Sequence, residues 1–339
     1  MWPSEARATL SRVHASGVAR TVEEGSTVSW DRQEPRSKGS AAHEFATFGP
    51  VHLHVVDGDQ SRRFWCDVVG LRPLRGRKHA VELGADGTEG GPLLVLHPGA
   101  IVPVRRGHSG LYHLALHLPD DAEFARALAR LIARRWPIAP TDHVMSKSIY
   151  LDDPDGIGLE LTLETPERQH SMRFTATGME VIDADGRVRN GVDRLDVDEV
   201  LAALPDDDLD KALPAATKVG HLHLHVADLD AAVRFYRDDI GFIEHLRSDG
   251  LGMADLHAGG AFPHRLAINT WQGLGAPRPP AGMAGLRHFT IRFDAPARLQ
   301  AVGERVAGVG RRDDGLRVRD PSGNAMLLTT GESGPNRTF

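Results

Sequence analysis

Two stretches of the chain show the same order of hydrophobic and polar residues and align without a gap. The first is GPVHLHVVDGDQSRRFWCDVVGL, residues 49–71, and the second is GHLHLHVADLDAAVRFYRDDIGF, residues 220–242. Each begins with the period-2 alternation of a β-strand and continues as an amphipathic helix. Asp57 and Asp228 stand between the two parts, at the position of a helix N-cap. Both stretches are therefore predicted to fold as strand–helix units.

A second pair of stretches alternates in the same way. GLYHLALHLPDDAEFARAL begins at Gly110 and GLRHFTIRFDAPARLQAV begins at Gly285. Each is followed by a common ending, which is DDPDGIGLEL from Asp152 and RDPSGNAMLL from Arg319. A DP-x-G turn before alternating residues predicts a tight turn that leads into a strand. The chain thus contains two kinds of unit in the order a-b-a′-b′.

These repeats predict four modules, each a helix with several strands. Their boundaries are 47–98, 109–165, 218–272 and 284–331. One module cannot bury its sheet face alone, so two modules are expected to pair into a curved eight-stranded half-barrel. The predicted fold class is α+β.

Taken in sequence order, the modules give two domains, 47–165 and 218–331, joined by a linker at 166–217. Residues 1–46 are rich in Ser, Arg, Glu and Gly and show no sustained period. Such a segment is predicted to be a disordered or loosely docked extension.

Composition narrows the class of protein. Of 339 residues, 41% are hydrophobic and 25% charged, the balance of a soluble globular protein. The net charge of −6 gives no electrostatic support for binding nucleic acid. The single cysteine excludes an internal disulfide. Without a long apolar run or a signal-peptide core, we expect no membrane association and a cytoplasmic location. A homo-oligomer is compatible with this sequence.

The motifs GHLHLHVADLDAAVRFYRDDIGF, GLYHLAL and DPDGIGLEL resemble those of the vicinal-oxygen-chelate superfamily, which includes glyoxalase I, bleomycin-resistance proteins and extradiol dioxygenases. More narrowly, SIYLDDPDGIGLEL, HAGGAFPHRLAINTWQG and GLRHFTI are similar to four-module catechol 2,3-dioxygenase-like proteins. The resemblance covers residues 47–331. It implies four βαβββ modules in two half-barrels, and an Fe(II)-dependent dioxygenase that acts on a small catechol-type aromatic with O₂ in aromatic compound catabolism.

The resemblance also implies the positions of the metal ligands. Two ligands come from the first strands of paired modules, and a glutamate comes from the strand after the DP-x-G turn. The matching first-strand positions are Pro50, His113, His221 and His288, and the matching positions after the turn are Glu160 and Leu327. Proline and leucine side chains cannot bind a metal ion, so this chain departs from the pattern at two positions.

Module pairing decides which ligands meet. If the second module pairs with the third, one site is complete, with His113, His221 and Glu160, and the other is degenerate. Pairing in sequence order leaves both sites incomplete, unless His52, two residues after Pro50 on the same strand face, replaces the missing ligand. We expect crossed pairing and keep His52 as the alternative. Two histidines and one carboxylate suit Fe(II), and Mn(II) would accept the same ligands.

Two residues are candidates for proton transfer. The resemblance places a catalytic tyrosine ten residues before the glutamate ligand, and Tyr150 stands there before Glu160. It also places a histidine upstream of that tyrosine, where His143 lies in TDHVMSKSIY. A core tyrosine and a loop histidine are the alternatives. His54, His223 and His225 share the strand face of the ligand positions and are expected to line the cavity or to be structural, and His264 is expected to be a relic or a cavity residue.

Other functions remain open. A glyoxalase I-like isomerase or lyase generally uses two carboxylates, whereas the second such position here is Leu266. Enzymes that add a thiol or water to an epoxide antibiotic typically have a single pair of modules. A metal-free small-molecule binding protein of the resistance type would be favoured if His113 and Glu160 converge with no second histidine.

Overall fold

The computed structural model describes residues 43–74, 80–87, 91–175, 178–306 and 308–331. Most of the predicted extension, 1–46, lies outside these ranges. Its last residues belong to the fold, because the amide of Phe45 donates to the carbonyl of Ala258 at 2.8 Å and Arg265 Nε donates to Glu44 at 2.9 Å. Within the described ranges, no helix is both long and apolar enough to span a membrane.

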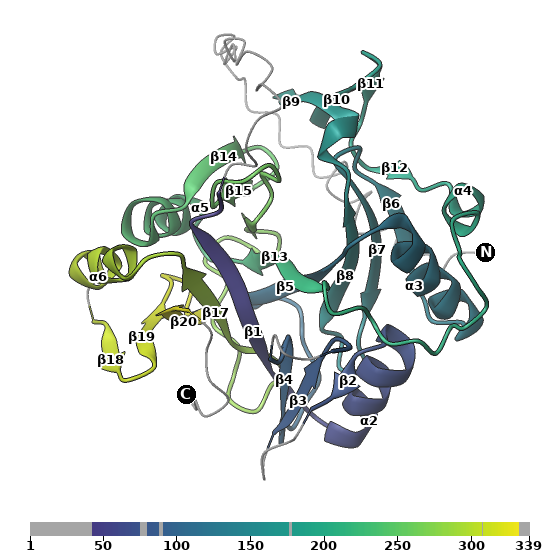
Figure 1. The fold of residues 1–339 in the computed structure, drawn as a ribbon. Helices are drawn as coiled ribbons and strands as arrows, with labels where there is room; N and C mark the ends of the chain where they lie inside the picture. Colours follow the sequence, from purple (N-terminus) through teal and green to yellow (C-terminus); the bar gives the residue numbers. More distant parts are fainter. Residues whose placement is uncertain (1–42, 75–79, 88–90, 176–177, 307, 332–339) are drawn as a thin grey trace. The chain divides into compact units, whose positions relative to one another are not determined.

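The first and fourth modules share one sheet (Figure 1). Its strands, in spatial order within the described residues, are β18 (Gly310–Arg312), β19 (Gly315–Arg319), β20 (Ala325–Thr330), β17 (Gly285–Phe293), β1 (Ala46–Val55), β4 (Leu94–Pro98), β3 (Val81–Gly84) and β2 (Arg72–Pro73). The two modules meet where β1 and β17 pair antiparallel. We call this the first sheet.

The second and third modules share the other large sheet. Its strands, again in spatial order, are β12 (Asp193–Arg194), β6 (Ala139–Asp142), β7 (Ser146–Asp152), β8 (Gly158–Glu164), β5 (Gly110–Leu118), β13 (Lys218–His225), β16 (Leu266–Asn269), β15 (Met253–His257) and β14 (Ile243–Ser248). Antiparallel pairing of β5 with β13 joins the modules. The expected crossed pairing is therefore observed in this second sheet.

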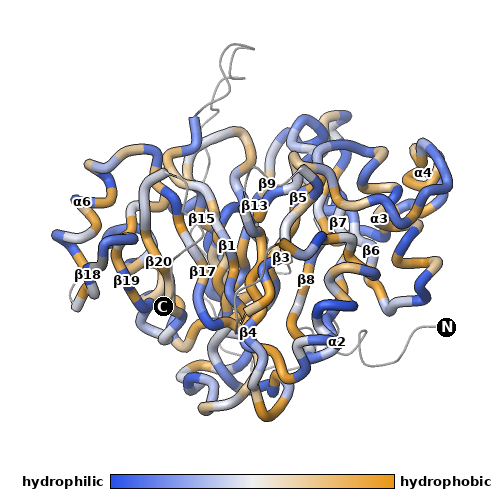
Figure 2. Tube along the Cα trace, turned by 60° about the horizontal axis from the view of Figure 1, so that its bottom comes forward, coloured by the Kyte–Doolittle hydropathy of each residue, from blue (hydrophilic) through white to orange (hydrophobic). Residues whose placement is uncertain are grey.

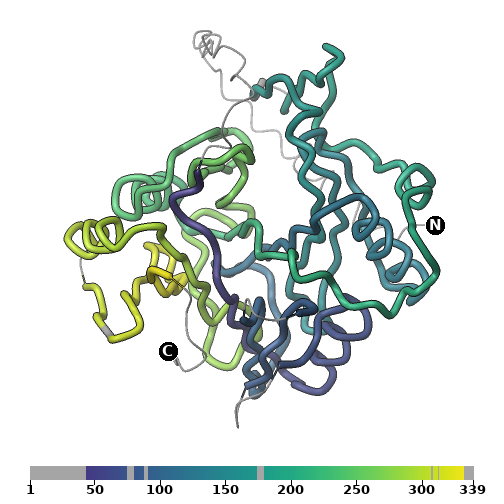
Figure 3. Tube along the Cα trace, viewed as in Figure 1, coloured from purple at the N-terminus to yellow at the C-terminus, as the bar shows by residue number. Residues whose placement is uncertain are grey.

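The sheets do not follow the predicted division into domains 47–165 and 218–331. Each sheet takes one module from each half of the chain, because the first strands pair across the halves; Figure 3 shows the purple β1 beside the yellow-green β17. The helices are α2 (Gly58–Arg63), η1 (Phe64–Val69), α3 (Asp121–Ala133), η2 (Pro166–Arg168), α4 (Val197–Leu201), α5 (Leu229–Arg234), η3 (Phe235–Ile240) and α6 (Pro296–Arg305). Consecutive modules meet through them, η1 against α3 and η3 against α6.

The predicted strand–helix units form as expected. The Asp57 carboxylate accepts hydrogen bonds from the first-turn amides of α2, and Asp228 caps α5 in the same way. Each α-helix continues as a single π-helical segment, η1 or η3. Gly70 and Gly241 end these segments with φ of 101° and 100°, a left-handed conformation that glycine adopts without strain.

The hydrophobic core follows the central strands. In Figure 2, hydrophobic colour is frequent along strands such as β4 and β8, while helices such as α3 and α6 carry both hydrophobic and hydrophilic residues. Leu53, Leu114, Leu224 and Phe289, one from each first strand, are fully buried. Helix α3 packs on β8, α5 on β15 and β16, and α6 on β17 and β20. These three helices therefore cover strands of both large sheets.

The linker 166–217 packs against the second module. Its strands β9 (Gln169–Thr175), β10 (Gly178–Asp183) and β11 (Val188–Arg189) form a small sheet. Two arginines of α3 fasten the part that follows: Arg130 donates to the carbonyl of Leu209 at 2.6 Å, and Arg126 forms an ion pair with Asp206 at 2.5 Å. The linker is thus anchored at several points along its length.

Candidate metal centre

The register of the second sheet brings the three predicted ligands together. Ala115 on β5 is paired with Glu160 of β8 on one side and with His221 of β13 on the other. Side chains in such a transverse row share a face, and the small methyl group of Ala115 leaves room between its neighbours. His113 lies two residues before Ala115 on β5, on the same face. Three strands therefore each contribute one ligand to a single point.

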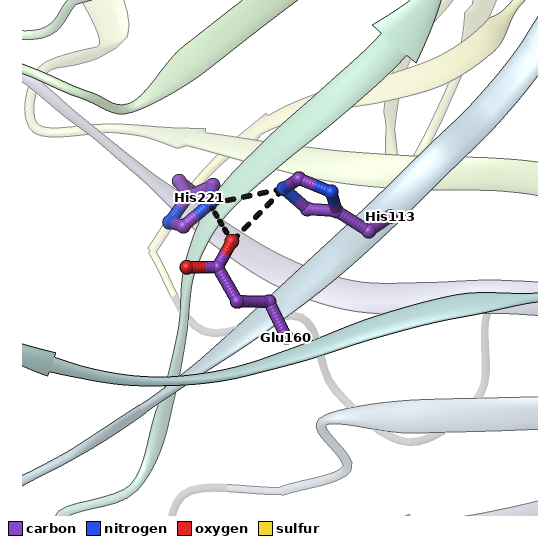
Figure 4. Close-up of side chains that lie close together, drawn as sticks. All are labelled: His113, Glu160 and His221. Atoms are coloured by element: carbon purple, nitrogen blue, oxygen red, sulfur yellow. Dashed lines mark hydrogen bonds and ion pairs between the residues drawn. The ribbon is translucent and has the colours of Figure 1, made fainter. Parts of the chain in front are cut away.

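Figure 4 shows the convergence of these three side chains. Glu160 Oε2 lies 2.9 Å from His221 Nε2 and 3.0 Å from His113 Nε2, and the two imidazole nitrogens are 3.3 Å apart. All three residues are buried. Among the described residues, this is the one group of three or more histidine, cysteine or acidic side chains close enough to share a metal ion.

The spacing of the three atoms fits a facial metal site. Two ligand atoms about 2.1 Å from one ion and at right angles lie about 3 Å apart, whereas opposite ligands lie about 4 Å apart. All three distances here are close to the first value. Two imidazole nitrogens and one carboxylate oxygen are also the donor set of non-haem Fe(II) enzymes. The residues present therefore fit such an ion.

The protonation states also suit metal binding. Burial opposes ionisation of Glu160, but attraction from His221 and hydrogen bonds from both histidines hold the pKa of Glu160 well below its usual range. Burial lowers the pKa of His221 well below its usual value, although Glu160 acts in the opposite direction. An ionised carboxylate and a neutral imidazole are the forms that bind a metal ion.

The predicted proton-transfer pair lies beside this group. Tyr150 on β7 is paired with Glu160 in the sheet, and its ring contacts that of His113. His143 Nε2 lies 2.9 Å from the Tyr150 hydroxyl oxygen, and His143 Nδ1 lies 2.6 Å from the carbonyl oxygen of Gly191 in the linker. Burial raises the pKa of Tyr150 well above its usual value, and Glu160 adds to that effect. Both predicted residues thus reach the site.

The alternative ligand His52 lies elsewhere, in the first sheet. Its Nδ1 is 2.9 Å from His97 Nε2, and its ring stacks on that of His288 with centroids 3.9 Å apart. It is absent from the group formed by His113, Glu160 and His221. The reason is the crossed pairing, which places the first and second modules in different sheets.

Further aromatic and polar side chains surround the group. The ring of Tyr112 contacts those of His223, His225 and Trp271. Asn269, at the end of β16, lies between the two histidines, with Nδ2 2.7 Å from His223 and Oδ1 2.7 Å from His225. These residues form a largely buried, hydrogen-bonded wall on one side of the candidate site.

His264, expected from the sequence to be a relic or a cavity residue, lies beside His221. Its ring centroid lies 4.5 Å from that of His221, and its Nδ1 forms an ion pair with the buried Asp255 at 3.0 Å. Burial favours the neutral imidazole, but Asp255 outweighs burial and raises the pKa of His264. An imidazole–carboxylate pair therefore borders the site.

Two further residues support the site and were not predicted from the sequence: His117 contacts the ligand residue His221, and Glu164 contacts His117. His117 Nε2 lies 2.7 Å from His221 Nδ1, and His117 Nδ1 lies 2.7 Å from Glu164 Oε1. The signal was present in the spacing, because each stands four residues after a predicted ligand on the same strand, His113 or Glu160. Positions separated by four residues share a strand face.

Comparison with known proteins agrees with the fold and the motifs. Residues 47–161 match the Glyoxalase/Bleomycin resistance protein/Dioxygenase superfamily. A catechol-2,3-dioxygenase of Bacillus subtilis (strain 168) is 33% identical over 298 residues, which span 85% of this chain and 98% of that protein.

Two solved structures share the fold at low sequence identity. One is a candidate dioxygenase from Bacillus subtilis, with 14% identity, a TM-score of 0.57 and coverage of 86% of both chains. The other is glyoxalase I from Zea mays, with 14% identity, a TM-score of 0.51 and coverage of 84% of this chain and 92% of that one. The chain therefore has the vicinal-oxygen-chelate fold and belongs to the glyoxalase/bleomycin resistance/dioxygenase superfamily.

Proposed function

We propose that this protein is a non-haem Fe(II)-dependent extradiol dioxygenase that opens the ring of a catechol-type aromatic. The observation that carries the proposal is the convergence of His113, His221 and Glu160 beside the Tyr150–His143 pair. The relative named catechol-2,3-dioxygenase, which aligns over nearly its whole length, supports the same class of reaction.

Each of the three ligand residues would offer one atom to the metal ion. Fe(II) held by two imidazoles and a carboxylate would supply coordination positions for a catecholate and O₂. The Glu160 carboxylate brings a negative charge that offsets part of the charge of a divalent ion. His113, His221 and Glu160 are buried, and electrostatic interactions are stronger in the protein interior than in water.

The Tyr150–His143 pair provides a route for the substrate proton. His143 Nδ1 donates to the Gly191 carbonyl, which can only accept, so the neutral imidazole offers a lone pair at Nε2. The Tyr150 hydroxyl then donates to that Nε2. As Tyr150 passes its own proton to His143, its oxygen can take the proton from a catechol hydroxyl, and the charge balances at each step.

Two competing functions are less well supported. For a glyoxalase I-like reaction, the expected second carboxylate is replaced by Leu266, a fully buried residue of β16. A metal-free binding protein was favoured only if His113 and Glu160 met no second histidine. Here His221 Nε2 lies within 3.3 Å of a ligand atom of each.

Oxygen consumption tests the proposal. Anaerobically purified protein loaded with Fe(II) should consume O₂ with at least one member of a catechol panel and form a yellow ring-opened semialdehyde. Glu160→Ala should abolish uptake, whereas Leu327→Ala, at the equivalent position of the first sheet, should retain it. Tyr150→Phe should lower kcat by about 10²- to 10⁴-fold, the usual range for a lost proton-transfer group. Iron-loaded protein that consumes no O₂ with any catechol would contradict the assigned reaction.

A further inference from the structure

A continuous chain of hydrogen bonds lies behind one of the three ligand residues. His221 faces Glu160 with Nε2 and turns Nδ1 toward His117 Nε2, 2.7 Å away. His117 Nδ1 in turn lies 2.7 Å from Glu164 Oε1. The order Glu164–His117–His221 links a carboxylate near the outside of the sheet to the candidate metal ligand.

The chemistry of the first bond sets the direction of the others. An ionised carboxylate can only accept, so Nδ1 of His117 carries a hydrogen. Nε2 of the neutral His117 imidazole is then an acceptor, and Nδ1 of His221 must donate to it. Glu160 Oε2, 2.9 Å from His221 Nε2, would accept a hydrogen from that atom in the metal-free protein. When a metal ion takes the place of that hydrogen, the bond to His117 leaves the lone pair of His221 on Nε2, the atom that faces Glu160 and His113. Only that tautomer of His221 can bind a metal ion through Nε2.

The fold holds this chain of side chains in place. A Cβ atom at Gly220 would lie 2.0 Å from the His117 ring, so the ring occupies space that only glycine leaves open. Phe262 packs edge-on against His117 with ring centroids 5.3 Å apart. Arg265 Nη1 donates both to Glu164 at 2.9 Å and to the carbonyl of Gly220 at 3.1 Å. Phe262 therefore fixes the His117 ring, and Arg265 fixes the Glu164 carboxylate.

The first sheet lacks this chain as well as the ligands. Internal alignment places Arg292 at the position of His117, Gly331 at that of Glu164 and Pro50 at that of His221. Within the second sheet, His113 differs from His221, because His113 Nδ1 is buried without a hydrogen-bond partner in the described part of the chain. The hydrogen-bond chain Glu164–His117–His221 thus supports one histidine, His221, of the sheet that holds the complete ligand set.

We propose that Glu164 and His117 are positioning residues that hold His221 as the Nδ1–H tautomer, with its Nε2 lone pair directed at the metal position. The inference rests on the proposed metal site but not on the identity of the substrate. Glu164 and His117 touch neither the metal position nor the reacting atoms, and they act through His221 alone.

The test compares metal affinity in His117→Phe and His117→Gln. Phenylalanine keeps a ring but accepts no hydrogen bond, whereas the glutamine amide oxygen can still accept from His221 Nδ1. Titration of metal-free protein with Co(II) should show about 10- to 100-fold weaker binding for His117→Phe, the range for loss of such a partner. His117→Gln should recover most of the affinity. Arg292→Phe, the same change at the equivalent position of the first sheet, should bind as the parent does.

A second readout follows the His221–His117 hydrogen bond in the metal-loaded protein. In the ¹H–¹⁵N spectrum of the parent protein loaded with the diamagnetic ion Zn(II), the Nδ1–H of His221 should be shifted downfield by its bond to His117 Nε2, and His117→Phe should lose that shift. Equal Co(II) affinity in the parent and His117→Phe, or a His221 Nδ1–H signal that His117→Phe leaves unchanged, would overturn the positioning role. Absence of Co(II) binding by the parent would instead overturn the metal site of the proposed function, and the positioning role with it.

Discussion

The two large sheets share one plan and differ in a transverse row of side chains. In the second sheet the row runs Glu160–Ala115–His221 across β8, β5 and β13. In the first sheet Thr290 of β17 is paired with Leu327 on one side, and the neighbouring β1 is irregular between Phe48 and Val51, where Pro50 lies. Pro50 has no amide hydrogen to donate to a ladder. The first sheet therefore keeps the fold but has no ligand set at this row.

What remains in the first sheet is a packed histidine cluster. His288, which is equivalent to His113, stacks on His52, and His97 lies between His52 and Arg287 through hydrogen bonds of 2.9 Å on each side. Leu327 is buried in place of the glutamate. Backbone pairing and apolar packing therefore suffice for the fold of both sheets, while the metal-ligand set depends on a few positions on one sheet face.

The largest expected difference between the sheets concerns metal affinity. His113→Ala removes one of three ligand atoms, so we expect Co(II) or Mn(II) affinity to fall by at least about 100-fold, more than for loss of a supporting hydrogen bond. His288→Ala removes the equivalent histidine of the first sheet and should leave both affinity and a stoichiometry of one ion per chain unchanged. Isothermal titration with each ion measures both quantities. Weaker binding in His288→Ala would mean that the first sheet also holds metal.

A smaller difference should separate two equivalent glycines. At Gly220 an added Cβ would lie 2.0 Å from the His117 ring, whereas at Gly49 it would lie 3.0 Å from side-chain atoms of Arg292 and Thr290. Gly220→Ala should therefore lower the free energy of unfolding by about 1–3 kcal/mol, the usual cost of overpacking, and Gly49→Ala by less. Urea unfolding of both variants tests the order. An equal loss of stability would show that the His117 ring can move aside.

The four modules, the helix caps and the crossed pairing of the sheets were all predictable from the sequence. Internal repeats located the modules, and the caps at Asp57 and Asp228 were predicted from residue type and confirmed. Local signals succeed here because a cap or a turn depends on a few neighbouring residues. The positions Pro50 and Leu327 also favoured crossed pairing, since one complete ligand set required it, and the sheets have that pairing.

Other features depend on contacts between distant segments. The division into domains 47–165 and 218–331 followed sequence order, and it is wrong because the crossed pairing that the ligand positions favoured also places the first module with the fourth, through β1 and β17. The chain Glu164–His117–His221 was not predicted, because His117 reaches His221 only once β13 lies beside β5. The partnership of His143 with Gly191 needs the linker to fold back onto the second module.

The smallest expected difference concerns the two DP-x-G turns. Asp153 and Asp320 are equivalent buried carboxylates. Asp320 Oδ2 accepts from the Tyr236 hydroxyl at 2.9 Å and from Asn324 Nδ2 at 2.8 Å, whereas Asp153 Oδ2 has no hydrogen-bond partner among the described residues. Burial raises the pKa of Asp153 to about 7, from 3.8 for an ordinary aspartate, against the hydrogen bonds from backbone amides. Burial therefore disfavours the ionised form of Asp153 in the folded protein.

That shift predicts a pH effect on stability. Between about pH 4 and 7 folded Asp153 retains a proton that the unfolded chain releases, so its contribution is present below pH 4 and is lost as the pH rises through 7. Asp153→Asn has no charge to bury, so its free energy of unfolding should fall less between pH 5 and pH 8, by about 1–3 kcal/mol. Asp320→Asn should be destabilised at both pH values, because Tyr236 and Asn324 lose their acceptor. Urea unfolding at the two pH values measures this. An unchanged pH dependence in Asp153→Asn would show that Asp153 is ionised throughout that pH range.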